Sequence, residues 1–173
     1  MNLPNKLTLF RVFLVPVFVF LLLTGYQWAA LGVFFLACFT DFADGRIARK
    51  YNLVTNFGKF MDPLADKLLI CSALICLVEL KAFPAWITIV IIAREFVVSG
   101  LRLIAADAGI VIAASWWGKF KTASQMIMIT LLVTNIEKFK YLTEMMIWLT
   151  LALTLISMID YIWQNRAVFS KKT

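Results

Sequence analysis

The chain has 173 residues, 62% of them hydrophobic, and its mean hydropathy of +0.88 is too high for a soluble domain of this length. These values exclude a water-soluble globular protein and predict an all-α integral membrane protein. The net charge of +7 arises from basic residues that flank apolar stretches. This placement favours anionic lipid and phosphorylated substrates as partners, and not nucleic acid.

Six apolar stretches follow one another, each about 18 to 24 residues long and able to cross about 30 Å of hydrocarbon. They are 7–24, 28–45, 61–80, 83–105, 119–136 and 142–163. We expect a bundle of six transmembrane helices that forms a single domain over residues 1–173. The first stretch lacks a small-residue cleavage pattern, so we interpret it as a retained helix and not as a signal peptide.

Turn-forming residues separate these stretches. Pro4 lies in a polar segment that is typical of a helix start. Gly25 and Pro84 indicate turns on the outer side, and Gly118 indicates the end of an inner loop. The longest polar interval is 45–59, which we expect to be an inner loop.

The lysine and arginine residues predict the orientation, because short cytoplasmic loops carry most of them. With the N-terminus in the cytoplasm, fourteen basic residues fall on the inner side of the membrane. Only Lys81, Lys138 and Lys140 fall on the outer side. We therefore expect both termini in the cytoplasm, and an even number of spans agrees with this.

Four aspartates lie at the inner ends of the second and third stretches. Asp41 and Asp44 are three residues apart. Asp62 and Asp66 are four residues apart, so each pair occupies one face of its helix. Four carboxylates gathered in a membrane repel one another unless a cation lies among them. Because the chain has no histidine, carboxylates are the expected ligands, and Mg²⁺ or Mn²⁺ are the metals that they suit.

A cation channel or transporter would also place acidic residues inside a membrane. Such a protein would distribute its carboxylates along a path across the bilayer. Here the aspartates cluster at one depth, and the outer half of every predicted helix is nearly uncharged. This pattern favours an enzyme whose polar cavity opens to the cytoplasm, with a transporter as the alternative.

The stretch from Asp41 to Asp66 reads Asp-x2-Asp-Gly-x2-Ala-Arg-x8-Gly-x3-Asp-x3-Asp. It resembles the signature of the CDP-alcohol phosphotransferases at every fixed position, and the resemblance extends over essentially the whole chain. It implies two Mg²⁺ or Mn²⁺ ions per active site, held by Asp41, Asp44 and Asp62. Asp66 would be the catalytic general base and a further contact of the second ion.

The resemblance also indicates how the nucleotide is bound. Gly45 would let the backbone approach the bound group, since it has no side chain. Arg49 would donate a fork of hydrogen bonds to phosphate. The other positions that line the nucleotide pocket by resemblance are Pro4, Asn5, Leu7 and Thr55.

Further segments resemble members of the family that join CDP-diacylglycerol to sn-glycerol 3-phosphate. These segments are 2–5 with Arg11, 58–67, 93–95, 100–102 and 118–122. The resemblance implies these two substrates, a lipid environment and a homodimer. It also implies the bacterial cytoplasmic (inner) membrane, with the active site facing the cytoplasm. Another acceptor alcohol, such as inositol phosphate, stays open because the metal-binding aspartates are common to the family.

An acceptor that carries its own phosphate requires additional cations. Arg94 and Arg102 are eight residues apart, or about two helical turns, and so lie on nearly one face. Lys119 and Lys121 begin the next helix on the same inner side. We assign these four residues to the acceptor phosphate, with anchoring at the headgroups as the alternative for the two lysines. Glu95 is placed to orient one of the arginines.

Overall fold

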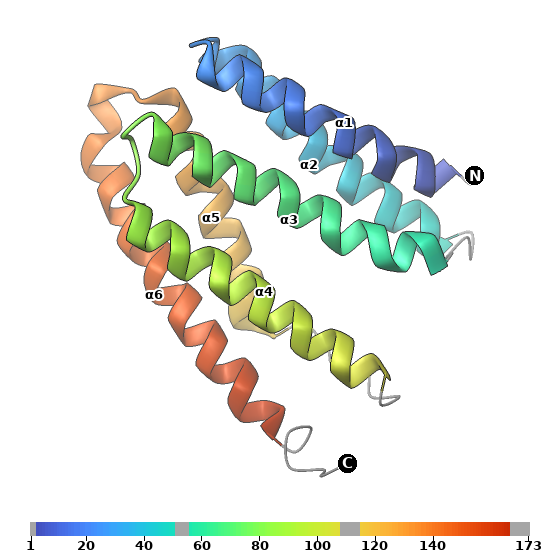
Figure 1. The fold of residues 1–173 in the computed structure, drawn as a ribbon. Helices are drawn as coiled ribbons and strands as arrows, with labels where there is room; N and C mark the ends of the chain where they lie inside the picture. The colour runs from blue at the N-terminus through green and yellow to red at the C-terminus, as the bar shows by residue number, and fades with distance from the viewer. Residues whose placement is uncertain (1–2, 51–55, 108–114, 167–173) are drawn as a thin grey trace. The chain divides into compact units, whose positions relative to one another are not determined.

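The computed structural model describes residues 3–50, 56–107 and 115–166, and within these ranges it is helical throughout, apart from short turns (Figure 1). Its elements are α1 (Leu3–Leu23), α2 (Gln27–Lys50), α3 (Asn56–Glu79), α4 (Ala85–Asp107), α5 (Trp116–Thr134), the short 3-10 helix η1 (Glu137–Phe139) and α6 (Lys140–Gln164). The α-helices have 19 to 25 residues. They therefore extend for about 28 to 38 Å. The prediction of an all-α fold with six long helices is confirmed.

Two helical segments within the described residues are long and apolar enough to cross a membrane. They are Lys6–Leu23 and Glu137–Gln164, and Gln27–Asp41 is a shorter apolar segment. Other helices carry charges within their length, as α4 does at Arg94 and Glu95. Length and composition alone therefore support membrane insertion most directly for the first and last of the six α-helices.

The helices extend further into the predicted inner loops than the apolar stretches do. Because α2 continues to Lys50 and α3 begins at Asn56, most of the interval 45–59 is helical and not a loop. α5 begins before Gly118, since Oγ of Ser115 accepts a hydrogen bond from the Gly118 amide at 3.2 Å and caps the helix. The predicted loop boundaries were wrong here because polar residues also form helix, and apolar patterning does not detect them.

The described residues form two compact units, Met1–Phe83 with α1 to α3 and Pro84–Thr173 with α4 to α6. In the first unit, α1 packs against α2 and α3, and α2 also contacts α3. Phe18 and Phe34 are fully buried there, with their ring centroids 5.8 Å apart. The turn between α1 and α2 contains Gly25 at φ +86°, a conformation that glycine adopts without strain, which confirms the predicted turn.

In the second unit, α6 packs against both α4 and α5. Its apolar core includes Ile91 of α4 and Met128 and Ile129 of α5, all fully buried. A row of polar side chains is also buried in this unit. Its members are Thr88, Arg94, Lys121, Ser124, Gln125, Thr150, Thr154 and Ser157.

Candidate functional site

All four predicted metal-binding aspartates belong to the first unit. Asp41 and Asp44 lie in α2, and the other two lie in α3, which contacts α2. The backbone is α-helical over both pairs, as their spacing required. Asp41 is the one whose side chain the structure describes; the side chains of Asp44, Asp62 and Asp66 lie outside the described residues. The described side chains include one of these four aspartates. Among the described side chains, no group of three potential metal ligands occurs.

Asp41 is held by an arginine from α1. Nη1 of Arg11 lies 2.7 Å from Oδ1 of Asp41. The Arg11 side chain is 1% exposed, whereas the Asp41 side chain is 43% exposed. The arginine is thus packed inside the unit, while the carboxylate is open. The Asp41 carboxylate fits Mg²⁺ or Mn²⁺, because these ions bind carboxylate oxygens. Arg11 would fix the orientation of this ligand from outside the metal site.

The predicted nucleotide-binding residues also belong to the first unit. Leu7 lies in α1 and is half-buried. The other predictions concern residues whose side chains lie outside the described residues, namely Pro4, Asn5, Gly45, Arg49 and Thr55. Their assignment to the nucleotide stays a prediction.

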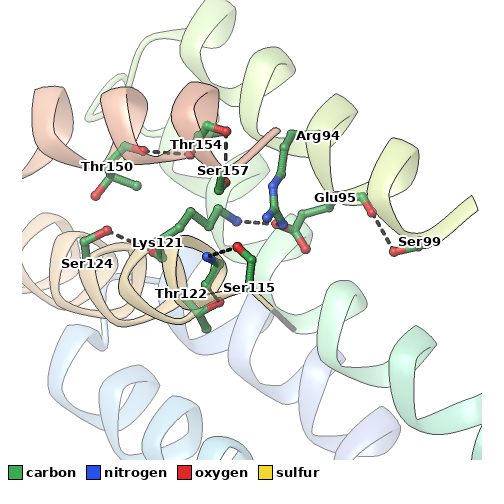
Figure 2. A network of polar contacts seen from close by, with 11 residues as sticks. Arg94, Glu95, Ser99, Ser115, Lys121, Thr122, Ser124, Thr150, Thr154 and Ser157 are labelled. Carbon is green, nitrogen blue, oxygen red and sulfur yellow. Dashed lines mark hydrogen bonds and ion pairs between the residues drawn. The ribbon is translucent and has the colours of Figure 1, made fainter. Parts of the chain in front are cut away.

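A buried ion cluster lies in the second unit, formed by Arg94 and Glu95 of α4 and Lys121 of α5 (Figure 2). We call it the Glu95 cluster. Oε1 of Glu95 accepts a hydrogen bond from Nη1 of Arg94 at 3.1 Å and another from Nζ of Lys121. The side chains of Arg94, Glu95 and Lys121 are 10%, 18% and 1% exposed. Two cations share one carboxylate oxygen, so these three side chains together keep one positive charge.

Hydroxyl groups of α6 add to the polar interior of this unit. Thr154 and Ser157 are fully buried. Figure 2 shows them on α6, in the same close-up as the Glu95 cluster. Oγ1 of Thr154 donates to the carbonyl of Thr150 at 2.6 Å, and Oγ of Ser157 donates to the carbonyl of Thr154 at 3.0 Å. Their donors are therefore satisfied within the helix, which makes these hydroxyls compatible with a buried position.

The other two predicted acceptor residues make different contacts. The guanidinium carbon of Arg102 lies 5.7 Å from the ring centroid of Tyr161 of α6. Nζ of Lys119 lies 4.5 Å from the ring centroid of Trp116 in the same helix. Both cations are exposed. Of the four residues assigned to the acceptor phosphate, the structure brings Arg94 and Lys121 together on Glu95 and places the other two over aromatic rings.

A family profile described as CDP-alcohol phosphatidyltransferase matches residues 1–156. The chain belongs to this family. A relative from Bacillus subtilis (strain 168) is 43% identical, with 95% of each chain covered, and is named "CDP-diacylglycerol--glycerol-3-phosphate 3-phosphatidyltransferase". Relatives of the same name from Haemophilus influenzae and Rickettsia bellii are 38% and 40% identical. They cover 93% and 92% of this chain, and 91% and 93% of their own lengths.

Membership of the CDP-alcohol phosphatidyltransferases confirms the resemblance predicted from the aspartate signature. It makes the chain an enzyme of group transfer and removes the support for a cation transporter. Because the sequence has no histidine, an imidazole group is neither the base nor a metal ligand of this enzyme.

Two features of this phosphatidyltransferase were missed at the level of sequence. Arg11 was noted as part of a segment but given no role, although a cation within an apolar stretch indicates a partner in the same unit. Glu95 was expected to orient an arginine, and its bond to Lys121 was not foreseen. The two residues are 26 apart and lie on different helices, so helical spacing does not predict their contact.

Proposed function

We propose that this chain transfers the phosphatidyl group of CDP-diacylglycerol to sn-glycerol 3-phosphate, giving phosphatidylglycerophosphate and CMP. The main support is the group of relatives named for this reaction, which match more than nine-tenths of the chain. The primary hydroxyl of the acceptor attacks the phosphatidyl phosphorus in line. The bond from that phosphorus to the bridging oxygen breaks, and CMP leaves with this oxygen.

Within this reaction we assign the first unit to the donor. Asp41, Asp44 and Asp62 would hold two Mg²⁺ or Mn²⁺ ions, which when bound neutralise the diphosphate and stabilise the leaving CMP. The ion pair with Arg11 supports the role of Asp41, since it fixes one oxygen of an otherwise open carboxylate. Gly45 and Arg49 would bind the nucleotide. Thr55 would line the same pocket, together with Pro4, Asn5 and Leu7 at the start of α1.

Asp66 would take the proton of the attacking hydroxyl. It follows Asp62 by four residues in α3, so it is one helical turn away from a metal-binding position. A carboxylate in this place can accept the proton as the new bond forms. This assignment requires no covalent intermediate on the enzyme.

We assign the acceptor phosphate to the second unit, chiefly to Arg94 and Lys121. The charge of the Glu95 cluster supports this, because its two cations exceed its one carboxylate. Nε of Arg94 is buried and has no hydrogen-bond partner within the described residues, so it is a further donor for a phosphate oxygen. Arg102 and Lys119 are exposed and would contribute through long-range attraction.

For the whole chain, we propose six transmembrane spans in one functional domain over residues 1–173, with both termini in the cytoplasm. The excess of basic residues on one side supports this orientation. The enzyme would act as a homodimer in the bacterial cytoplasmic membrane, with its active site facing the cytoplasm. The lipid donor would then reach the site from the inner leaflet, since its acyl chains stay in hydrocarbon.

The test is an assay of CMP release by the purified protein in detergent, with CDP-diacylglycerol and Mg²⁺. Glycerol 3-phosphate and inositol phosphate are compared as acceptors, with a sample lacking acceptor as the blank. We expect release with glycerol 3-phosphate, and its loss when EDTA removes the metal or when Asp66 is changed to Asn. Release with inositol phosphate and none with glycerol 3-phosphate would contradict the proposed acceptor.

A further inference from the structure

The Glu95 cluster joins two helices through a single atom. Arg94 is the sequence neighbour of Glu95 in α4, whereas Lys121 comes from the second turn of α5. Both cations bond to Oε1 of Glu95, as Figure 2 shows. Their nitrogen atoms are therefore held within hydrogen-bond distance of one shared oxygen.

The carboxylate stabilises both cations in this position. Lys121 is 1% exposed, and a carboxylate at hydrogen-bond distance stabilises a buried ammonium group. Arg94 is also largely buried, and the two like charges repel each other. Glu95 thus compensates the repulsion between two groups that the unit holds close together.

The local backbone supports the same arrangement. Oγ of Ser115 caps α5 at the Gly118 amide, which sets the start of the helix that carries Lys121. A Cβ added at Gly118 would lie 3.7 Å from Nη2 of Arg94, so the guanidinium lies directly against this first turn. On α4, Oγ of Ser99 donates to the carbonyl of Glu95 at 2.6 Å.

We infer, on the basis of the function proposed above, that Glu95 is the positioning residue of the acceptor site. It holds the Arg94 guanidinium and the Lys121 ammonium around one oxygen atom before substrate arrives. A phosphate group offers oxygens of the same hydrogen-bonding character, so the two cations are already at a separation that one phosphate can bridge. Because the cations are ordered in advance, less freedom is lost when the acceptor binds.

This role differs from that of a salt bridge that merely fastens α4 to α5. A fastening contact would affect stability and both substrates alike. A positioning residue affects the acceptor selectively, and its effect requires the cations on which it acts. The Michaelis constants for the two substrates, together with a double-mutant cycle, distinguish these two roles.

The experiment measures CMP release as a function of each substrate for the wild type, Glu95→Gln and Glu95→Asp. Glu144→Gln is the matched control, because it removes an exposed acidic charge from α6 of the same unit. We expect Glu95→Gln to raise KM for glycerol 3-phosphate by about tenfold or more, and KM for CDP-diacylglycerol by less than about twofold. Glu95→Asp keeps the charge and should give an intermediate KM, and Glu144→Gln should behave like the wild type.

Lys121→Gln and the double variant Glu95→Gln/Lys121→Gln complete the cycle. If Glu95 acts in part through Lys121, part of its effect is lost once Lys121 is gone, and the increase of KM in the double variant is clearly smaller than the product of the two single increases. An increase of KM in the double variant that equals the product of the two single increases would overturn the inference. An unchanged KM for the acceptor in Glu95→Gln would also overturn it. If Glu95→Gln does not fold, Glu95→Asp decides, since a wild-type KM in that variant also overturns it. A wild-type enzyme without turnover on glycerol 3-phosphate would refute the proposed acceptor instead.

Discussion

The two units of the chain use their carboxylates in different ways. In the first unit, four aspartates lie on two contacting helices. One of them, Asp41, forms an ion pair with Arg11. In the second unit, one glutamate is shared by two cations. We propose that the carboxylates of the first unit bind metal ions themselves, whereas the carboxylate of the second unit holds the cations that bind a phosphate.

The two arrangements also differ in what they bury. At the Arg11–Asp41 pair, the cation is buried and the carboxylate is 43% exposed, so the acidic oxygen is available as a ligand. In the Glu95 cluster all three side chains are largely buried, so the carboxylate compensates cations already present. A carboxylate in this chain can therefore bind a ligand itself or position groups that do.

The largest expected effects come from the aspartates of the first unit. Asp66→Asn should lower kcat by about 10²- to 10⁴-fold, because it removes the proposed proton acceptor, while Mg²⁺-dependent binding of CDP is largely kept. Asp62→Asn should abolish both turnover and this binding. CMP release and calorimetric titration with CDP measure the two quantities. Equal loss of CDP binding in both variants would show that Asp66 acts chiefly as a ligand.

The sequence predicted the two helices that carry these aspartates, because the information for a helix is local. Helical spacing suffices to pair Asp41 with Asp44 on one face, and the structure confirms the helix there. Apolar stretches likewise predicted six helices, since each is one continuous segment. The ends were less accurate because residues such as Lys50 extend helices without adding apolar character.

Contacts between helices could not be predicted in the same way. Arg11 and Asp41 are 30 residues apart, and Lys121 lies 26 residues from Glu95. Each contact depends on how two helices are rotated about their axes, which the packing of many side chains decides together. The sequence indicates that a buried charge needs a partner, but it does not identify that partner.

The next largest effect is expected at Arg11 of the first unit. Arg11→Met removes the outer partner of Asp41, and we expect activity at limiting Mg²⁺ to fall by about ten- to hundredfold. Lys6→Met is the matched control, because Lys6 is an exposed cation in the same helix. Titration of activity with Mg²⁺ measures the concentration needed for half of the maximal rate. An unchanged titration curve in Arg11→Met would show that the pair does not support the metal site.

A smaller contrast is expected between two lysines of the second unit. Lys121→Gln should raise KM for glycerol 3-phosphate by about tenfold, because it removes a buried charge from the Glu95 cluster. Lys119→Gln should raise it by less than about threefold, because that lysine is exposed over Trp116. Equal effects would mean that both lysines act only through the general positive field.

A small effect is also expected at Arg102. Its guanidinium lies over Tyr161, an interaction worth about 0.5–1 kcal/mol at an exposed site. An exposed guanidinium held by this ring acts on the acceptor through long-range attraction, so Arg102→Gln should raise KM for the acceptor by less than about fivefold. Arg166→Gln is the control, because it removes another exposed arginine that lies over an aromatic ring of α6. A larger rise, comparable to that of Lys121→Gln, would place Arg102 in direct contact with the acceptor phosphate.

The proposed assignment of the four aspartates can be examined by anomalous scattering from crystals of the enzyme grown with Mn²⁺ and CDP. We predict two strong peaks beside the inner ends of α2 and α3, within coordination distance of the carboxylates of Asp41, Asp44 and Asp62. Crystals in which CDP is bound and no manganese peak lies at these carboxylates would contradict the assignment.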